Sequence, residues 1–211
     1  MHRLVKAWQN NKSLIVFISL MFVFRSAVAD WSDVPTGSMK PTIIEGDRIL
    51  VNKMAYDVRL PFTHTSLIKL SDPQRNDIII FDSKISDKRL VKRVIGVPGD
   101  IIYMKDNVLT INGQTLSYQQ ANEQDKIEQL LNHQHQIRTL NNNNRFASFE
   151  PVTVPEKQYL VLGDNRDNSA DSRFIGFVPR KEIVGRSSTV VVSLDYDNYF
   201  IPRSERFFHS L

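Results

Sequence analysis

Short runs of aliphatic residues separated by turn-forming residues dominate the chain after residue 34, and they limit the folds open to it. The runs occupy residues 48–51, 77–81, 90–97, 101–104, 108–111, 158–162 and 188–194. They are rich in isoleucine and valine, and the segments between them are rich in Gly, Pro, Asn and Asp. Because β-branched runs bounded by such residues are typical of strands, we predict a mainly β fold built on antiparallel sheet.

Two features refine this expectation. Asn112-Gly113 follows the run at 108–111 and indicates a two-residue hairpin turn. The segment at about 114–152 differs from the rest, because residues 118–149 are rich in Gln and Asn. It carries only a weak helical pattern, at Ile127, Leu130 and Leu131. We interpret it as a polar insertion between strands, mobile near its centre at residues 141–144.

The N-terminus combines basic residues with an apolar run at 14–24, followed by Arg25 and by Ala27-Val28-Ala29. One interpretation is a cleaved signal peptide with an Ala-x-Ala site. The other is an uncleaved membrane anchor, although residues 14–29 as a helix would reach only about 24 Å across a hydrocarbon core of about 30 Å. The local pattern favours neither. Both export the remainder, because the positive charges precede the apolar run.

Composition excludes several classes. With 41% hydrophobic residues the chain can bury a core. The net charge of +4 is spread along the chain without a basic cluster interleaved with aromatics, so we expect no nucleic-acid binding. There is no cysteine, which excludes thiol catalysis and disulfides. His64, His133 and the other histidines have no carboxylate cluster nearby in the sequence, so we expect no metal and no cofactor.

Ser38 is a candidate nucleophile. It follows Gly37, and Pro35 and Pro41 flank the segment. A glycine permits close backbone approach and prolines stiffen the chain, which suits a rigid, exposed serine. Thr-Gly-Ser also occurs in ordinary turns, so the motif alone does not establish a site.

Lys92 is a candidate base, because a serine hydroxyl needs a neighbouring group to take its proton. Lys92 and Arg93 stand side by side in an apolar run, and strand alternation sends their side chains to opposite faces. A guanidinium stays protonated, whereas a buried lysine can lose its proton. The alternative is that both are exposed charges on an edge strand.

A dense polar run, residues 163–173, directly follows the strand expected at 158–162. Asp171 and Arg173 could pair and stiffen it, and Ser169 could orient an ammonium group. Judged locally, a solvated turn explains the segment equally well.

Taken together, these segments resemble the bacterial type I signal peptidases, membrane-bound serine proteases that remove signal peptides from exported proteins. The blocks that match do so in family order and cover most of the chain outside the insertion and the tail. They are residues 35–42, 46–51, 75–81, 92–100, 163–173 and 176–179. The resemblance implies the antiparallel β fold that these enzymes share with repressor-type autoproteases, preceded by one N-terminal transmembrane helix.

The resemblance also implies roles for individual residues. Ser38 would be the nucleophile and Lys92 the general base, with Thr36 and the Ser38 N–H forming the oxyanion hole. Ser169 would hydrogen-bond the lysine, and the pair Asp171 and Arg173 would support the site. The small pockets for alanine-like side chains would be lined by Val34, Ile43, Ile49 and Val91. Asn76 departs from the glycine usual in the family, at a position expected to lie away from the site.

The family keeps its apolar segment as an anchor, which favours that interpretation here. We expect residues 1–12 in the cytoplasm, a single-pass anchor at 13–30 in the bacterial inner (plasma) membrane, and a catalytic domain at 31–211 on the periplasmic or outer side. The implied partners are preproteins bearing signal peptides and the lipid bilayer, and the enzyme would be a monomer. Ala27-Val28-Ala29 could still be a self-cleavage site.

Three other functions fit parts of this pattern. A specialised Ser/Lys peptidase for pilin or conjugation substrates would share the same residues and stays open. A repressor-type autoprotease is disfavoured, because an apolar segment rather than a helix-turn-helix precedes Ser38. A non-catalytic exported domain would leave the combination of Ser38, Lys92 and Ser169 without a purpose.

Overall fold

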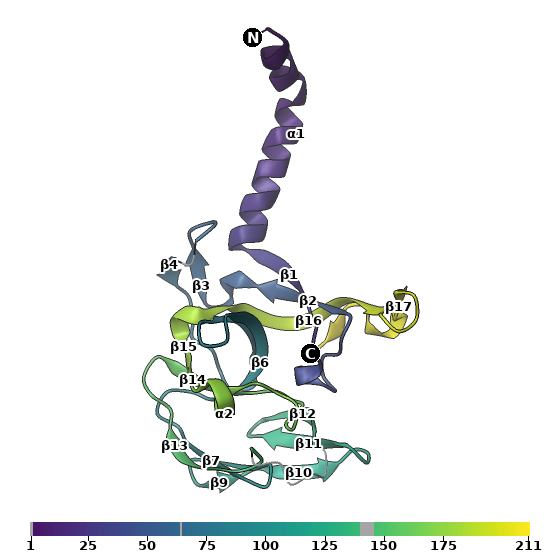
Figure 1. The fold of residues 1–211 in the computed structure, drawn as a ribbon. Coiled ribbons are helices and arrows are strands. Elements are labelled where there is room, and N and C mark those ends of the chain that lie inside the picture. Colours follow the sequence, from purple (N-terminus) through teal and green to yellow (C-terminus); the bar gives the residue numbers. More distant parts are fainter. Residues whose placement is uncertain (1, 64, 140–145) are drawn as a thin grey trace.

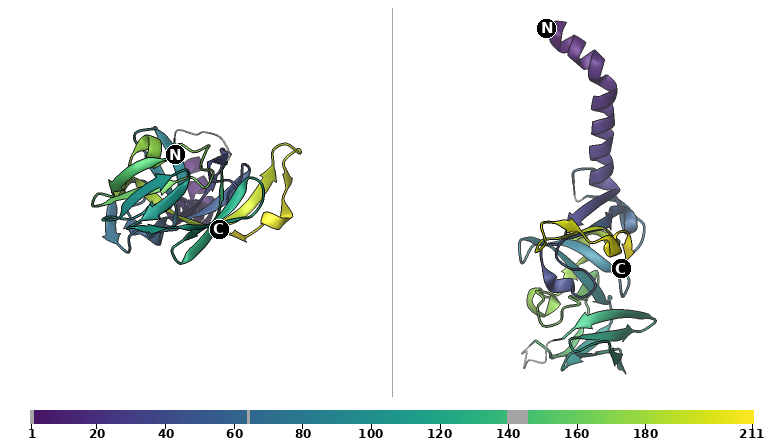
Figure 2. Two further views of the ribbon diagram at one scale, coloured as in Figure 1. Left: turned by 90° about the horizontal axis from the view of Figure 1, so that it is seen from below. Right: turned by 90° about the vertical axis from the view of Figure 1, so that its right-hand side faces the viewer.

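The computed structural model describes residues 2–63, 65–139 and 146–211, so His64 and the asparagine run at 141–144 lie outside the described residues. A β domain carries one long N-terminal helix, α1 (His2–Ala27), which projects away from it in both side views (Figures 1 and 2). The prediction of a mainly antiparallel β fold is confirmed.

The main sheet places strands from both halves of the chain side by side. In spatial order its strands are β1 (Ala29–Asp33), β2 (Asp47–Asn52), β16 (Ile183–Asp195), β5 (Ile78–Ser83), β6 (Lys88–Gly96), β14 (Gln158–Leu162) and β15 (Val178–Pro179). Two short strands near the C-terminus, β17 (Ile201–Pro202) and β18 (His209–Ser210), also pair with β16. Strand β6 is therefore interior, paired with β5 on one side and with β14 from Arg93 onward on the other.

Smaller sheets complete the domain. They are β13-β7-β8-β9, comprising Phe149–Thr153, Ile101–Lys105, Val108–Ile111 and Gln114–Thr115; β10-β11-β12, comprising Ser117–Gln120, Asp125–Leu130 and His133–Arg138; and β3-β4, comprising Asp57–Arg59 and Ser66–Lys69. The short helix α2 (Ser172–Ile175) follows β14 along the chain. The expected hairpin joins β8 to β9 through Asn112 and Gly113, whose φ angles of 50° and 81° are both positive, as a type I′ turn requires.

The insertion is more ordered than its composition indicated. The weak helical pattern does not form a helix. Ile127 and Leu130 belong to strand β11, and Leu131 lies in the turn after it with a φ of 53°. The sheet β10-β11-β12 lies at the end of the β domain opposite α1 (Figures 1 and 2).

The N-terminal segment differs in its bounds from the expected anchor at 13–30. Helix α1 ends at Ala27, and Ala29 already pairs with Asn52 of β2. Lys53 binds this junction, since its Nζ donates to the carbonyls of Arg25 and Ser26 at 2.9 and 3.3 Å. Among the described residues, no helix combines the length and apolar character needed to cross a bilayer.

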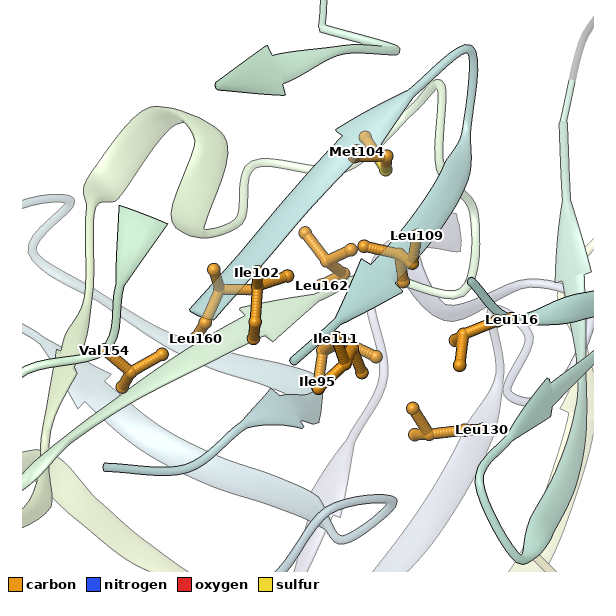
Figure 3. Close-up of a cluster of buried hydrophobic side chains, with 10 residues drawn as sticks. All are labelled: Ile95, Ile102, Met104, Leu109, Ile111, Leu116, Leu130, Val154, Leu160 and Leu162. Carbon is orange, nitrogen blue, oxygen red and sulfur yellow. The ribbon is translucent and has the colours of Figure 1, made fainter. Parts of the chain in front are cut away.

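Buried aliphatic side chains hold the smaller sheets to the main one. Ten of them form a cluster between β6 and β14 on one side and the β7-β8 hairpin with its neighbours on the other (Figure 3). Ile102 is fully buried in this cluster, whereas the preceding Ile101 points outward and is 51% exposed. Burial of this cluster fixes the β7-β8 hairpin and β11 against the strand that carries Lys92.

The two neighbouring isoleucines give a matched test of this packing. Ile102→Ala should lower the free energy of unfolding by about 2–5 kcal/mol, because it removes buried methyl groups and leaves a cavity. Ile101→Ala should change it by less than about 0.5 kcal/mol. Urea unfolding of both variants measures the difference, and equal effects would show that the cluster does not hold the sheets together.

Candidate active site

Ser38 lies in a 3₁₀ turn, Gly37–Met39, between β1 and β2. Met39 is buried in the core while Ser38 stays partly exposed, so the turn is anchored on one side and presents its hydroxyl on the other. Loop residues near 164 meet the same turn, since Asn165 N donates to Ser38 O at 3.1 Å.

The structure brings Lys92 to Ser38. Lys92 Nζ lies 2.7 Å from Ser38 Oγ and donates to the carbonyl oxygen of Val91 at 2.9 Å. Lys92 and Arg93 are each only 2% exposed, and their strand is interior. The alternative of exposed charges on an edge strand is therefore wrong.

Burial gives Lys92 an unusual protonation equilibrium. Removal from water lowers its pKa to about 8, and the negative charges of Asp171 and Asp164 limit the fall. At pH 7 about a tenth of this amine is then unprotonated, whereas at the ordinary pKa of 10.5 fewer than about one in a thousand would be. A neutral amine in contact with a hydroxyl can accept its proton, which is the arrangement that activates a serine.

The Arg93 side chain points away from Ser38 and binds the carboxylate of Asp164. Its Nε and Nη2 atoms donate to Asp164 at 2.8 and 2.7 Å, and both side chains are buried. Burial would raise the pKa of Asp164, but Arg93 outweighs it and holds that pKa below the usual range. Arg93 also donates to the side chain and the carbonyl of Asn76.

Asn76 thus contacts Arg93 on the side of β6 that faces away from Ser38. Its φ of 74° lies in the left-handed region, which asparagine tolerates better than most residues. This conformation explains why a glycine can occupy the same position.

The expected pair Asp171 and Arg173 is present. Arg173 Nε and Nη2 donate to the two Asp171 oxygens, each at 2.8 Å, and Asp171 is fully buried. Asp171 also accepts from the N–H of Gly163 at 3.0 Å and caps helix α2 through the N–H of Arg173. Through Asp171, the pair thus joins the end of the polar loop to its start at Gly163.

Ser169 lies at this loop but does not make the expected bond to the lysine. Its Oγ is buried without a hydrogen-bond partner among the described residues. A side chain on Gly163 would overlap both Ser169 Oγ and Ser38 O, so Ser169 and the nucleophile turn face the same glycine. The hydroxyl therefore lies near the main chain of the nucleophile turn.

Thr36 immediately precedes the 3₁₀ turn, and its side chain does not cap it. Within the described part of the chain, neither the Thr36 hydroxyl nor the Ser38 N–H has an intramolecular partner. A hydroxyl and an N–H are the kinds of donor that stabilise an oxyanion, and these two lie two residues apart in the sequence.

The four predicted pocket residues meet in one apolar cluster behind Ser38. Val34, Ile43 and Ile49 are buried in it, and Val91 packs against it from the residue before Lys92. They come from three separate segments, so only the fold brings them together. Val91 is the partly exposed member of the four, and the other three are buried.

The sequence did not predict the polar residues that support the turn carrying Ser38. Asn165 contacts the nucleophile turn, and Arg166 forms a buried ion pair with Glu128 of β11. The available signal was the density of charge in residues 163–173, since so many polar groups beside a buried strand need partners.

Comparison with known proteins identifies similar chains of one family. A family profile described as "Signal peptidase, peptidase S26" matches residues 7–192. Signal peptidase I of Pseudomonas aeruginosa is 36% identical over 203 residues, covering 87% of this chain and 72% of that protein. Signal peptidase I P of Bacillus subtilis subsp. natto is 33% identical over 187 residues, covering 87% and 88%. The crystal structure of a signal peptidase I from Enterococcus faecalis V583 is 35% identical, covers 56% of this chain and 98% of that chain, and has a TM-score of 0.38.

The lowered pKa of Lys92 can be measured directly. The Lys92 side chain should titrate with a midpoint near 8, because burial disfavours its charged form. NMR of protein labelled with ¹³C at lysine Cε would follow the change, and Lys92→Met would assign the resonance. A midpoint at the ordinary value of about 10.5 would contradict the buried, neutral amine.

Proposed function

The chain belongs to the peptidase S26 family of signal peptidases, which are serine endopeptidases, and on that premise we propose that Ser38 and Lys92 are its catalytic dyad. The enzyme removes N-terminal signal peptides from exported preproteins after an Ala-x-Ala-type site. The observation that carries the assignment is the 2.7 Å contact between a buried amine and the Ser38 hydroxyl.

The reaction follows from this contact. Neutral Lys92 takes the Ser38 proton as Oγ attacks the carbonyl carbon of the scissile bond, and the Ser38 N–H and the Thr36 hydroxyl donate to the oxyanion. The lysine then gives its proton to the departing amine. A water deprotonated by the same lysine releases the acyl-enzyme.

Two unpaired strand edges support an extended substrate. Within the described residues, β1 pairs only with β2, and Lys88–Lys92 of β6 pair only with β5. The pKa of Arg89 on β6 is raised by its ion pair with Asp82 and further by Asp30 of β1, so the two edges lie within electrostatic range. A preprotein segment can add to either edge by main-chain hydrogen bonds.

The apolar cluster supports small side chains in that segment. Alternate side chains of an extended peptide point to the same face, so residues one and three before the cut would both meet Val34, Ile43, Ile49 and Val91. Little open space adjoins these side chains, because the first three are at most 4% exposed. Alanine-like residues fit where larger ones do not.

Attachment to a membrane through residues 13–30 is the second part of the proposal. Large apolar side chains in the described part of α1 are exposed: Leu14, Phe17 and Leu20 are 54%, 64% and 63% exposed. With the basic residues preceding them, these side chains would place residues 1–12 in the cytoplasm and the catalytic domain, as a monomer, outside the bacterial inner membrane.

The dyad is tested by cleavage of a model Ala-x-Ala preprotein by detergent-solubilised protein. Ser38→Ala and Lys92→Met should each abolish cleavage while the protein stays folded, because one removes the nucleophile and the other the base. Wild-type kcat/KM should rise with pH through a midpoint near 8, as the lysine loses its proton. Near-wild-type turnover by either variant would refute the mechanism.

The same assay separates the oxyanion donor from the dyad. Thr36→Val should lose about 2.7–4 kcal/mol of transition-state stabilisation, a rate loss of about 10²–10³. Thr36→Ser keeps a hydroxyl and should retain most activity. Equal activity of the two variants would remove Thr36 from the oxyanion hole.

Membrane attachment is tested by fractionation of cells expressing the chain. The full chain should stay with the membranes after alkaline carbonate washing, because its exposed apolar helix is held by lipid. A variant lacking residues 2–27 should be released and should still cleave a soluble substrate. Release of the full chain by carbonate would contradict the anchor.

A further inference from the structure

The polar insertion is joined to the active-site loop by main-chain hydrogen bonds. Arg138, the last residue of β12, donates its N–H to Asp164 O at 2.8 Å and accepts at its carbonyl from Arg166 N at 2.9 Å. The two segments thereby form a short parallel bridge at Arg138 and Asn165. The end of β12 thus lies directly against residues 164–166.

A buried ion pair joins the same two parts. Arg166 donates through both terminal nitrogens to Glu128 of β11, at 2.8 and 2.6 Å, and neither side chain is exposed. Tyr118 donates to the same carboxylate at 2.6 Å, and His135 Nε2 lies 3.2 Å from it. Removing the Glu128 charge would leave the Arg166 charge buried without its partner.

Asn165 carries these contacts to the nucleophile. Its N–H donates to Ser38 O at 3.1 Å, and its side-chain Nδ2 donates to Gly37 O at 2.9 Å. Both carbonyls belong to the 3₁₀ turn that presents the Ser38 hydroxyl. Asn165 therefore holds the turn from behind, while Lys92 meets the hydroxyl.

We propose that Glu128, Arg166 and Asn165 are positioning residues, and that the sheet β10-β11-β12 braces the nucleophile turn through them. The proposal rests on the catalytic role proposed for Ser38. A shift of about 1 Å in a reacting group can cost about 100-fold in rate. None of the three belongs to the apolar cluster at the proposed pockets, so substrate affinity should be unaffected.

The test is a double-mutant cycle of Glu128→Gln and Asn165→Ala in the preprotein assay. Each single variant should lower kcat about 10- to 100-fold with KM within about twofold of wild type. The double variant should lose no more than Asn165→Ala alone, because both act through the same turn. Glu123→Gln, an exposed carboxylate ahead of β11, is the matched control and should match wild type.

Folding and function are controlled separately. Thermal unfolding first establishes whether each variant is folded. If Glu128→Gln is not folded, Asn165→Ala decides the question alone, by whether its loss of activity falls on kcat or on KM. A Glu128→Gln variant that matches Glu123→Gln, additive losses, or a loss confined to KM would each overturn the brace. If the wild type cleaves and Ser38→Ala does not, the proposed dyad stands. Any of the three contrary outcomes would then count against the brace alone.

Discussion

The burial of one amine, that of Lys92, is the constraint on which the site depends. A lysine removed from water favours its neutral form, and only that form can take a proton from Ser38. Lys92 lies opposite Ile79 of β5, one residue before pairing with β14 begins, so strand pairing alone does not bury it. The turn that carries Ser38 lies against its amine, and the side chain is only 2% exposed. The packing of that turn on β6 thus determines the chemistry of the side chain.

Nearby carboxylates would undo this effect if they were unpaired. Asp164 and Asp171 both act to raise the pKa of Lys92. Each is bound by an arginine through two hydrogen bonds, Asp164 by Arg93 and Asp171 by Arg173. Because guanidinium groups stay protonated, each arginine offsets the charge of its carboxylate. The pair then attracts a proton to the amine less strongly than a lone carboxylate would. The arginines therefore help the lysine to stay neutral without touching it.

Local signals predicted most of the fold. The aliphatic runs became strands, and Asn112-Gly113 formed its hairpin, because both signals depend on conformations set within a few residues. The pattern in the insertion failed for a physical reason. Ile127, Leu130 and Leu131 have helical spacing, but Leu131 turns the chain and Leu130 is buried by the β7-β8 hairpin and its neighbours. Tertiary contacts there outweigh a weak local preference.

The site was predictable only in part, for a related reason. Ser38 and Lys92 stood out because their side chains belong to a familiar motif, whereas Asn165 acts on main-chain carbonyls that have no sequence signature. Glu128 meets Arg166 across 38 positions of chain. Gly163 shows the same limit, since any side chain there would overlap Ser38 O and Ser169 Oγ. What the sequence conceals is the close approach of main chains around Ser38, and that approach sets where the hydroxyl lies relative to the amine.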